Sequence, residues 1–542
     1  MKLGMRRGLI AMLGAVAACL LAPGAAFGLG ITGTVTPASL QAGAHSDITV
    51  HVDFTGGQVK DLTIGLPPGV VGDPQATPLC TVAQLNANAC PANTQVGEVS
   101  ANVTILSLLP LTVPGKLFNL EAQPGEPARF GIVLSPLPLP LGQIILQSAV
   151  QLRQTDFGLN TVINGIPNTT LASGDTTITS QDITLYGTAP GTGKPFMRNP
   201  SSCTPATTNF SAVPYSGADA TAQDSFTPTG CGSEPFSPTF SARVGGPGQT
   251  AAQSHPPVST AIDQDVGEAG LQNATVLLPP NFSAELNVLS QTCAQADFDA
   301  GNCPANSIVG SAIATSPLLT EPLQGPVALI TNPGLPKVGL DLRGPLPLKL
   351  TGGFVITPSG TGVGFQNLPD IPIGHFALTF NGGPGGLVAT TADLCYTASI
   401  FNTSFDSWSG ANTGGNTTAS VDGCGPPTPR KIKGSLRKAH SPHPKLSLKI
   451  TGGAELRSVK VKLPKSLALG KGSDGIEAES LTIKHGKRNL AITTASPKLN
   501  LKIGSGELIR TGAIGKRVKL KVKVVDASGS STTRKVKIKA RG

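Results

Sequence analysis

Eight cysteines have the spacing that most clearly indicates chemistry in this sequence. The intervals of 10 and 28 residues within the first four recur as 10 and 29 residues within the second four. Even numbers of cysteines in exported chains form disulfides, whereas Zn²⁺ sites need ligand pairs that are closer together. Local pairing keeps each set of four self-contained. The expected disulfides are Cys80–Cys90, Cys203–Cys231, Cys293–Cys303 and Cys395–Cys424.

Lysine is the second residue type whose placement indicates chemistry. Near the C-terminus lysines alternate with apolar residues in segments 459–463, 518–524 and 536–539. This period of two places every ammonium group on one face of a strand, which could contact an anionic surface. The alternative is that these lysines only keep exposed strands soluble and protect sheet edges. The candidate contacts are Lys460, Lys462, Lys519, Lys521, Lys523, Lys537 and Lys539.

Charge is divided unevenly along the chain. Residues 430–542 contain 28 lysines and arginines against six acids, a net charge of +22, whereas the whole chain has +10. The preceding residues are therefore acidic. Because a balanced mixture of acids and lysines would be enough for solubility, the excess favours a bound polyanion. We expect the partner to be an anionic cell-wall polymer or another envelope component, with no specific nucleic acid.

Other motifs that suggest catalysis, nucleotide binding or metal binding lack a necessary residue. A phosphate loop would need glycine at Thr188 and serine or threonine at Pro195. His440 and His443 have a metal-like spacing but lie in a proline-rich stretch, and the acids at 297–301 have no counterparts in the corresponding residues 85–89. We therefore expect no enzyme, no cofactor and no metal. The alternative is an extracellular carbohydrate-binding protein or hydrolase whose site is assembled from distant loops.

Most of the sequence that must position these residues predicts β-strands. Segments such as 48–52 and 96–99 alternate apolar and polar residues, and glycine, proline and asparagine clusters separate them. Short helical turns are expected at 81–88 and 294–299, inside the two ten-residue cysteine loops. In the basic part, six or more short strands in about 100 residues are typical of an immunoglobulin-like sandwich.

An internal duplication relates the two cysteine sets. Residues 53–68 align without gaps on 265–280, and 90–97 match 303–310. Between the second and third cysteines copy one has 112 residues and copy two has 91, a difference of about one hairpin. A period near 200 residues indicates tandem domains rather than a solenoid. Each copy is large enough for two sandwich subdomains.

These motifs resemble those of large secreted repeat proteins from high-GC Gram-positive bacteria. The shared features are Leu-Pro-Pro-Gly at 66–69, a following cysteine, and Cys-Pro-Ala-x-Ser/Thr-x-Val-Gly at 90–97 and 303–310. Asn281 stands where the first copy has Gly69. The resemblance implies export and a modular β architecture, and it carries no assigned activity.

The N-terminus predicts export. A basic start, an apolar run from Gly8 to Leu21 and small residues at 26–28 fit a signal peptide cleaved after Gly28. The alternative is a lipid anchor at Cys19, since residues 16–19 resemble a lipobox. No later stretch approaches a membrane-spanning helix, because prolines interrupt the best candidate at 130–146. We expect a secreted, extracellular or cell-surface protein.

Together these features predict an all-β protein of tandem, disulfide-stapled, sandwich-like repeats with a basic C-terminal sandwich. Its expected function is structural or adhesive display at the cell envelope, where the basic module holds it electrostatically. The expected segments are a signal peptide at 1–28, β repeats at 29–231 and 232–425, a linker at 426–443 and the basic sandwich at 444–542.

Overall fold

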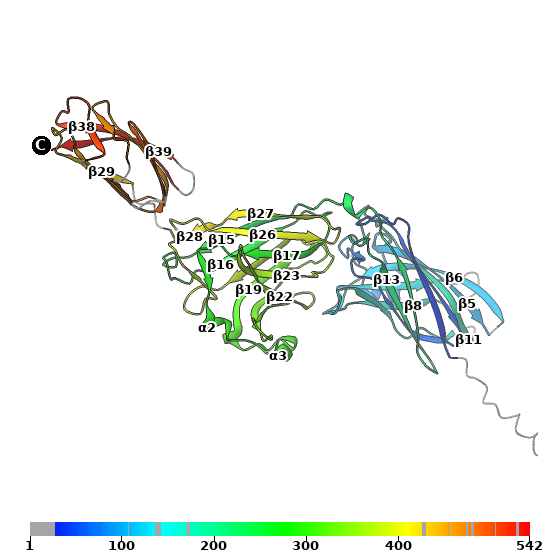
Figure 1. Ribbon diagram of the computed structural model, residues 1–542. Coiled ribbons are helices and arrows are strands. Elements are labelled where there is room, and N and C mark those ends of the chain that lie inside the picture. The colour runs from blue at the N-terminus through cyan, green and yellow to red at the C-terminus, as the bar shows by residue number, and fades with distance from the viewer. Residues whose placement is uncertain are drawn as a thin grey trace, which may run out of the picture.

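The computed structural model describes residues 28–542, apart from 107, 136–142, 171–173, 425–429, 454, 473–474, 479–481, 505 and 527–530. The expected signal peptide up to residue 27 and the alternative lipid site at Cys19 lie outside the described residues. The chain is all-β, with three large sheets that follow one another along the sequence (Figure 1).

The first repeat forms one 12-stranded sheet, in the order β1-β2-β11-β5-β6-β7-β8-β9-β3-β13-β14 with β10 beside β11. Its end strands β1 and β14 lie against each other, so the sheet wraps around its core. A two-stranded ribbon, β4-β12, covers one side. The bounds are β1 Gly30–Pro37, β2 Ile48–Thr55, β3 Val59–Gly65, β4 Val71–Gly72, β5 Gln95–Ile105, β6 Leu109–Leu120, β7 Ala128–Leu134, β8 Ile144–Leu152, β9 Leu159–Ile163, β10 Thr169–Thr170, β11 Gly174–Leu185, β12 Met197–Arg198, β13 Ala206–Pro214 and β14 Ala220–Phe226, with the helices α1 Val82–Asn86, η1 Ala92–Thr94 and η2 Cys231–Ser233.

The second repeat also forms one 12-stranded sheet and a two-stranded ribbon, β18-β25. Its bounds are β15 Thr239–Gly245, β16 Val258–Asp263, β17 Leu271–Leu277, β18 Phe282–Ala284, β19 Ile308–Thr315, β20 Leu323–Ile330, β21 Lys337–Leu342, β22 Leu348–Thr357, β23 Gly360–Phe365, β24 His375–Phe380, β25 Val388–Thr390, β26 Ile400–Ser407, β27 Asn412–Thr418 and β28 Ser420–Asp422, with the helices α2 Leu286–Leu289, α3 Gln295–Ala300 and η3 Ala305–Ser307.

Both repeats have the same strand order. The second sheet runs β15-β16-β24-β19-β20-β21-β22-β23-β17-β26-β27, which is the order of the first sheet strand for strand, with β28 added beside β15. Both copies shift register at the start of the strand after the cysteine loop, at 95–97 and at 308–310. The duplication seen in the sequence is therefore a duplication of the fold.

Two expectations about the repeats are wrong. Each repeat surrounds one main hydrophobic core, so it is a single domain and not two sandwich subdomains. The extra length of the first copy is also not one inserted hairpin. It is spread over longer strands, since β5, β6 and β11 have 11, 12 and 12 residues where β19, β20 and β24 have 8, 8 and 6. Strands lengthen at hairpin ends without a change in strand order.

The third domain is a sandwich with an immunoglobulin-like layout. Its sheet path is β33-β36-β30-β29-β39-β38-β31-β35-β34, in which β29-β30-β36 and β39-β38-β31 take the places of strands A-B-E and G-F-C. The first strand joins the two layers, because it pairs with β30 and in parallel with β39. The bounds are β29 Lys431–Arg437, β30 Lys445–Thr451, β31 Leu456–Lys462, β32 Leu467–Leu469, β33 Ile476–Glu477, β34 Thr482–Gly486, β35 Asn489–Ser496, β36 Leu499–Ile503, β37 Leu508–Arg510, β38 Arg517–Asp526 and β39 Ser531–Ala540.

The expected linker at 426–443 contains a strand of this sandwich. Residues Lys431–Arg437 form β29, and Leu436 is fully buried in the core. The sequence did not predict this strand, because it contains lysines and few apolar residues and lies close to Pro442 and Pro444. The third domain therefore begins near residue 431 and not at 444.

The four disulfides join the pairs expected from the spacing, Cys80–Cys90, Cys203–Cys231, Cys293–Cys303 and Cys395–Cys424. Within the first ten-residue loop, Thr81 caps α1 and forms a reciprocal capping box with Gln84. Cys80 and Cys293 make the same isolated bridge to the end of the neighbouring strand, at Leu120 and Ile330. The cysteine loops are thus clipped to equivalent places in both repeats.

Candidate functional site

A lysine-rich face covers the outer side of strands β31 and β38 in the third domain. In β38, residues 518, 520, 522 and 524 are buried while the lysines between them are exposed, so the period of two separates core from solvent. Cross-strand register places Lys460 opposite Lys523 and Lys462 opposite Lys521. On the other side of β38, Lys521 faces Lys535. The ammonium groups therefore gather on one surface.

Five of these lysines line a shallow hollow of about 590 Å³. Four are expected contacts, Lys460, Lys462, Lys521 and Lys523, and the fifth is Lys484 of the edge strand β34. Lys484 reaches the face because β34 pairs with β35, whose small Ala491 lies between Lys484 and Lys460. Sequence reasoning missed it, since a five-residue strand with one lysine carries little periodic signal.

The other expected contacts extend the same sheet beyond the hollow. Lys519 faces Lys537, and Lys539 faces Arg517, on the pair β38 and β39. None of these residues is among those that line the hollow. The structure therefore brings together four of the seven expected lysines and places the other three in adjoining cross-strand rows.

Protection of sheet edges does not explain four of the five lysines of the hollow, those of β31 and β38. β31 and β38 are interior strands of the path, with hydrogen-bonded neighbours on both sides. Like charges that face each other across strands destabilise a sheet, and no ion pair reaches these lysines within the described residues. Elsewhere in this domain, exposed Lys502 and Glu477 form an ion pair. An anion in the hollow would relieve this repulsion.

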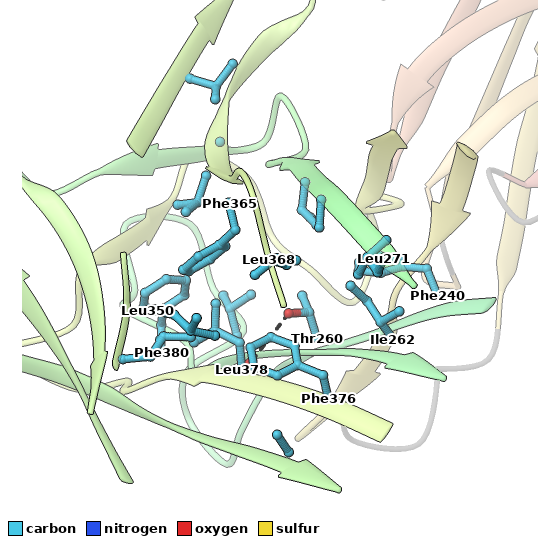
Figure 2. Close-up of a pocket in the computed structure, with 18 of the residues that line it drawn as sticks. Phe240, Thr260, Ile262, Leu271, Leu350, Phe365, Leu368, Phe376, Leu378 and Phe380 are labelled. Atoms are coloured by element: carbon cyan, nitrogen blue, oxygen red, sulfur yellow. Dashed lines mark hydrogen bonds between the residues drawn. The ribbon is translucent and has the colours of Figure 1, made fainter. Parts of the chain in front are cut away.

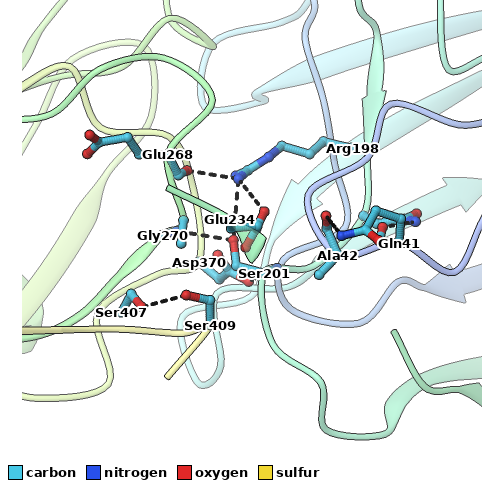
Figure 3. Close-up of polar contacts among 12 residues, drawn as sticks. Gln41, Ala42, Arg198, Ser201, Glu234, Glu268, Gly270, Asp370, Ser407 and Ser409 are labelled. Carbon is cyan, nitrogen blue, oxygen red and sulfur yellow. Dashed lines mark hydrogen bonds and ion pairs between the residues drawn. The ribbon is translucent and has the colours of Figure 1, made fainter. Parts of the chain in front are cut away.

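A second cluster of charged groups lies where the first two repeats meet (Figure 3). The buried guanidinium of Arg198, on β12, donates to the backbone oxygen of Glu268 at 2.9 Å and pairs with Glu234 at 3.3 Å. Asp370, from the second repeat, accepts the backbone N–H of Ser201 at 2.8 Å. The cluster therefore joins the first repeat, the connecting segment and the second repeat.

Burial dominates the electrostatics of this junction. It raises the pKa of the Asp370 carboxyl against the opposing effects of the Ser201 N–H and the Arg198 guanidinium. It also raises the pKa of Glu234, which Arg198 partly offsets. These residues do not line the apolar cavities beside the junction. The converging acids are enclosed in a contact between domains, which suits a structural role.

Histidine–carboxylate pairs occur on the sheet surfaces. His51 places one ring nitrogen 2.8 Å from Asp182 and the other 3.2 Å from Asp53. The hydrogen bond with Asp182 and the neighbouring negative charges raise the pKa of His51. His375 pairs with Asp263 across neighbouring strands at 2.6 Å. No hydroxyl or thiol side chain bonds to either histidine in the described residues, so no nucleophile–base pair is formed there.

The described residues contain no group of three or more histidine, cysteine, aspartate or glutamate side chains placed to hold a metal ion. In particular, His440 and His443 do not assemble such a group, nor do the acids near 297–301. Within the same part of the chain, no helix has both the length and the apolar character needed to cross a membrane.

Comparisons with known proteins give no family. No family model matches the sequence, and no curated protein matches it. Among solved structures, a tetra-tandem repeat from the extending region of a large adhesion protein is 9% identical, with 94% of this chain and 98% of that chain covered and a TM-score of 0.18. A putative membrane-anchored protein of Corynebacterium diphtheriae is 9% identical, with 95% of both chains covered and a TM-score of 0.16. The MSCRAMM ACE of Enterococcus faecalis, which binds its ligands by the collagen hug model, is 10% identical over 57% of this chain and 95% of that chain, with a TM-score of 0.15. Such scores carry no argument about function.

Proposed function

We propose that this chain is an exported, non-enzymatic display protein of the cell envelope. Its third domain binds an anionic envelope polymer through the lysine-rich face, and the two repeats project outward in a structural or adhesive role. The four disulfides support an oxidising, extracellular location.

The observation that carries the proposal is the row of facing lysines on interior strands. Lys460 opposite Lys523 and Lys462 opposite Lys521 cost stability in the absence of an anion. The hollow between them is open and lined by several ammonium groups, which suits a flexible polymer of repeated negative charges better than a small ligand. The acidic repeats would be repelled from the same surface.

Sedimentation of the full protein with purified cell walls tests this proposal. At low ionic strength the protein should sediment with the walls, and it should be released as salt rises towards about 1 M, where the Debye length falls to roughly 3 Å. Walls stripped of their acidic polymers should bind much less protein. All samples are treated with nuclease, because nucleic acid would compete as a generic polyanion. Equal binding to intact and stripped walls would overturn the proposal.

The positions of the charged side chains give little support to the alternative, a hydrolase or carbohydrate-binding protein. Its best candidate is the junction of Arg198, Glu234 and Asp370, whose side chains are buried between domains. A glycosidase needs two carboxyl groups that flank an accessible bond. A test of the intact protein for hydrolysis or retention of wall polysaccharides separates the two functions, since display through charge alone predicts no hydrolysis.

A further inference from the structure

The second repeat contains an apolar cavity of about 430 Å³ inside its wrapped sheet (Figure 2). The cavity lies within the size range of small-molecule sites, which is about 300–1,000 Å³. Phe365, Leu378 and Phe380 point into the same space from β23 and β24, and Ile262 and Leu271 enter it from β16 and the start of β17 (Figure 2). An interior of this size is a binding space rather than a packing defect.

The residues that line the cavity favour a hydrocarbon ligand. The lining contains no aspartate, glutamate, lysine, arginine or histidine side chain. Its few polar groups include Thr260, whose hydroxyl already donates to the backbone oxygen of Leu378 at 3.3 Å. Apolar cavities without unpaired polar partners do not hold water well and bind apolar molecules instead. The occupant is therefore an uncharged, flexible apolar group.

The first repeat shows that the fold itself does not require this cavity. Equivalent strands pair in the same register, and this places Leu62 of β3 where β17 has Ala274. It also places Val50 of β2 where β16 has Thr260. The interior space that Val50 lines in the first repeat has a volume of about 20 Å³. Smaller residues at matching positions open the interior of the second copy.

The cavity reaches solvent and adjoins a second apolar space. Leu335 and Ile356 line it, although they are 45% and 69% exposed, so part of the wall borders the surface. Elsewhere, Leu319 and Ile371 line both this cavity and a second apolar space of about 110 Å³ between the repeats. A long, thin group that enters from the surface can extend through the cavity towards this second space, and it therefore fits better than a compact ring.

We propose that the second repeat binds one acyl chain of a fatty acid or lipid in this cavity. The hydrocarbon fills the interior, and a charged head group stays in solvent because the walls offer it no partner. This inference does not depend on the lysine-rich face of the third domain. A free fatty acid and a membrane lipid present the same chain, so binding assays with each distinguish the source.

The test uses the full protein with two probes, radiolabelled palmitate and lysophosphatidylcholine of the same chain length. Ala274→Leu restores the side chain of the first repeat and should weaken binding of the preferred probe at least tenfold, with an unchanged or raised melting temperature. Ala261→Leu is the matched control. This residue alternates with Thr260 and Ile262 on β16 and does not line the cavity, so its variant should bind like the wild type.

Each outcome decides the proposal. Palmitate binding that is lost in Ala274→Leu identifies a free fatty acid, and loss of the lysolipid alone identifies a lipid source. If Ala274→Leu fails to fold, Thr260→Leu fills the cavity from β16 and carries the same expectation. Absence of binding by both probes, or equal binding by wild type and a folded cavity-filled variant, overturns the proposal.

Discussion

Lys460 on β31 lies directly opposite Lys523 on β38, in the interior of a sheet and not at its edge. Two ammonium groups in such a pair gain nothing from each other and are not neutralised by an acid in the described residues. The second pair, Lys462 and Lys521, repeats this arrangement one step along the strands. The lysines that we propose to bind an anionic polymer are therefore expected to lower the stability of the domain.

Replacement of these four lysines by glutamine separates the two demands. The variant should lose at least tenfold in affinity for cell walls at low salt, while relief of repulsion leaves its free energy of unfolding unchanged or raises it by about 0.2–1 kcal/mol per pair. Wall sedimentation and urea unfolding measure the two effects. The control is Lys433→Gln with Lys449→Gln, a facing pair on the other layer of the sandwich. The control removes two charges and the variant four, so a loss of binding free energy in the control that is half as large would show that total charge, and not this face, drives binding.

Arg198→Ala should uncouple the first two repeats. The substitution leaves Glu234 buried without its cation and removes the bond to the backbone of Glu268, which costs about 3–5 kcal/mol by analogy with other buried pairs. Differential scanning calorimetry should show an earlier transition, split between repeats. Arg243→Ala, which breaks the exposed pair with Asp422, should change the free energy of unfolding by less than about 1 kcal/mol. Equal effects of the two variants would contradict the structural role of the junction.

The junction should be more stable in mild acid than at neutral pH. Burial raises the pKa of Asp370 in the folded protein above its unfolded value, which is about 3.9. Its contribution to the free energy of unfolding is therefore complete below the unfolded pKa and is lost as pH rises through the folded pKa. Asp370→Asn should flatten this part of the stability profile, measured by thermal unfolding at successive pH values. Parallel profiles for wild type and variant would show that Asp370 does not titrate in this range.

Disulfide removal should cost more for the longer loop. The loop-closure relation gives about 3 kcal/mol for the 10-residue separation of Cys80 and Cys90, and about 1 kcal/mol more for the 28 residues between Cys203 and Cys231. Paired alanine variants of each disulfide, compared by urea unfolding of the full chain, measure this difference. A larger loss for the ten-residue loop would mean that the disulfide acts mainly through packing of the folded state and not through the entropy of the unfolded chain.

The sequence predicted the local features of this structure, which are the disulfide pairs, single strands and the internal duplication. Equal cysteine intervals predicted the disulfide pairs, because short loops close within one domain whatever the strand order. Alternating lysines predicted β38, since its first eight residues, 517–524, follow the period of two without interruption. The duplication also showed that both repeats share one fold before that fold was known.

The features that depend on strand order could not be predicted from the sequence. Lys484 joins the hollow only because β34 pairs with β35. The sequence of a five-residue strand does not indicate which strand it pairs with. Arg198 lies on a two-residue strand, and its partners Glu234 and Glu268 are 36 and 70 residues away. The cavity follows from the small side chain at Ala274, which matters only once the register with the first repeat is known.

The parallel pairing of β15 with β28 has a mechanical consequence. These are the first and last strands of the second repeat, and residues 243–245 lie beside 420–422. Tension that enters at the start of β15 and leaves at the end of β28 pulls the two strands past each other, so their hydrogen bonds are loaded together and not opened one by one. The disulfide at Cys424 follows β28 directly and ties this end of the repeat to Cys395. The second repeat is thus arranged to transmit force between the first repeat and the third domain.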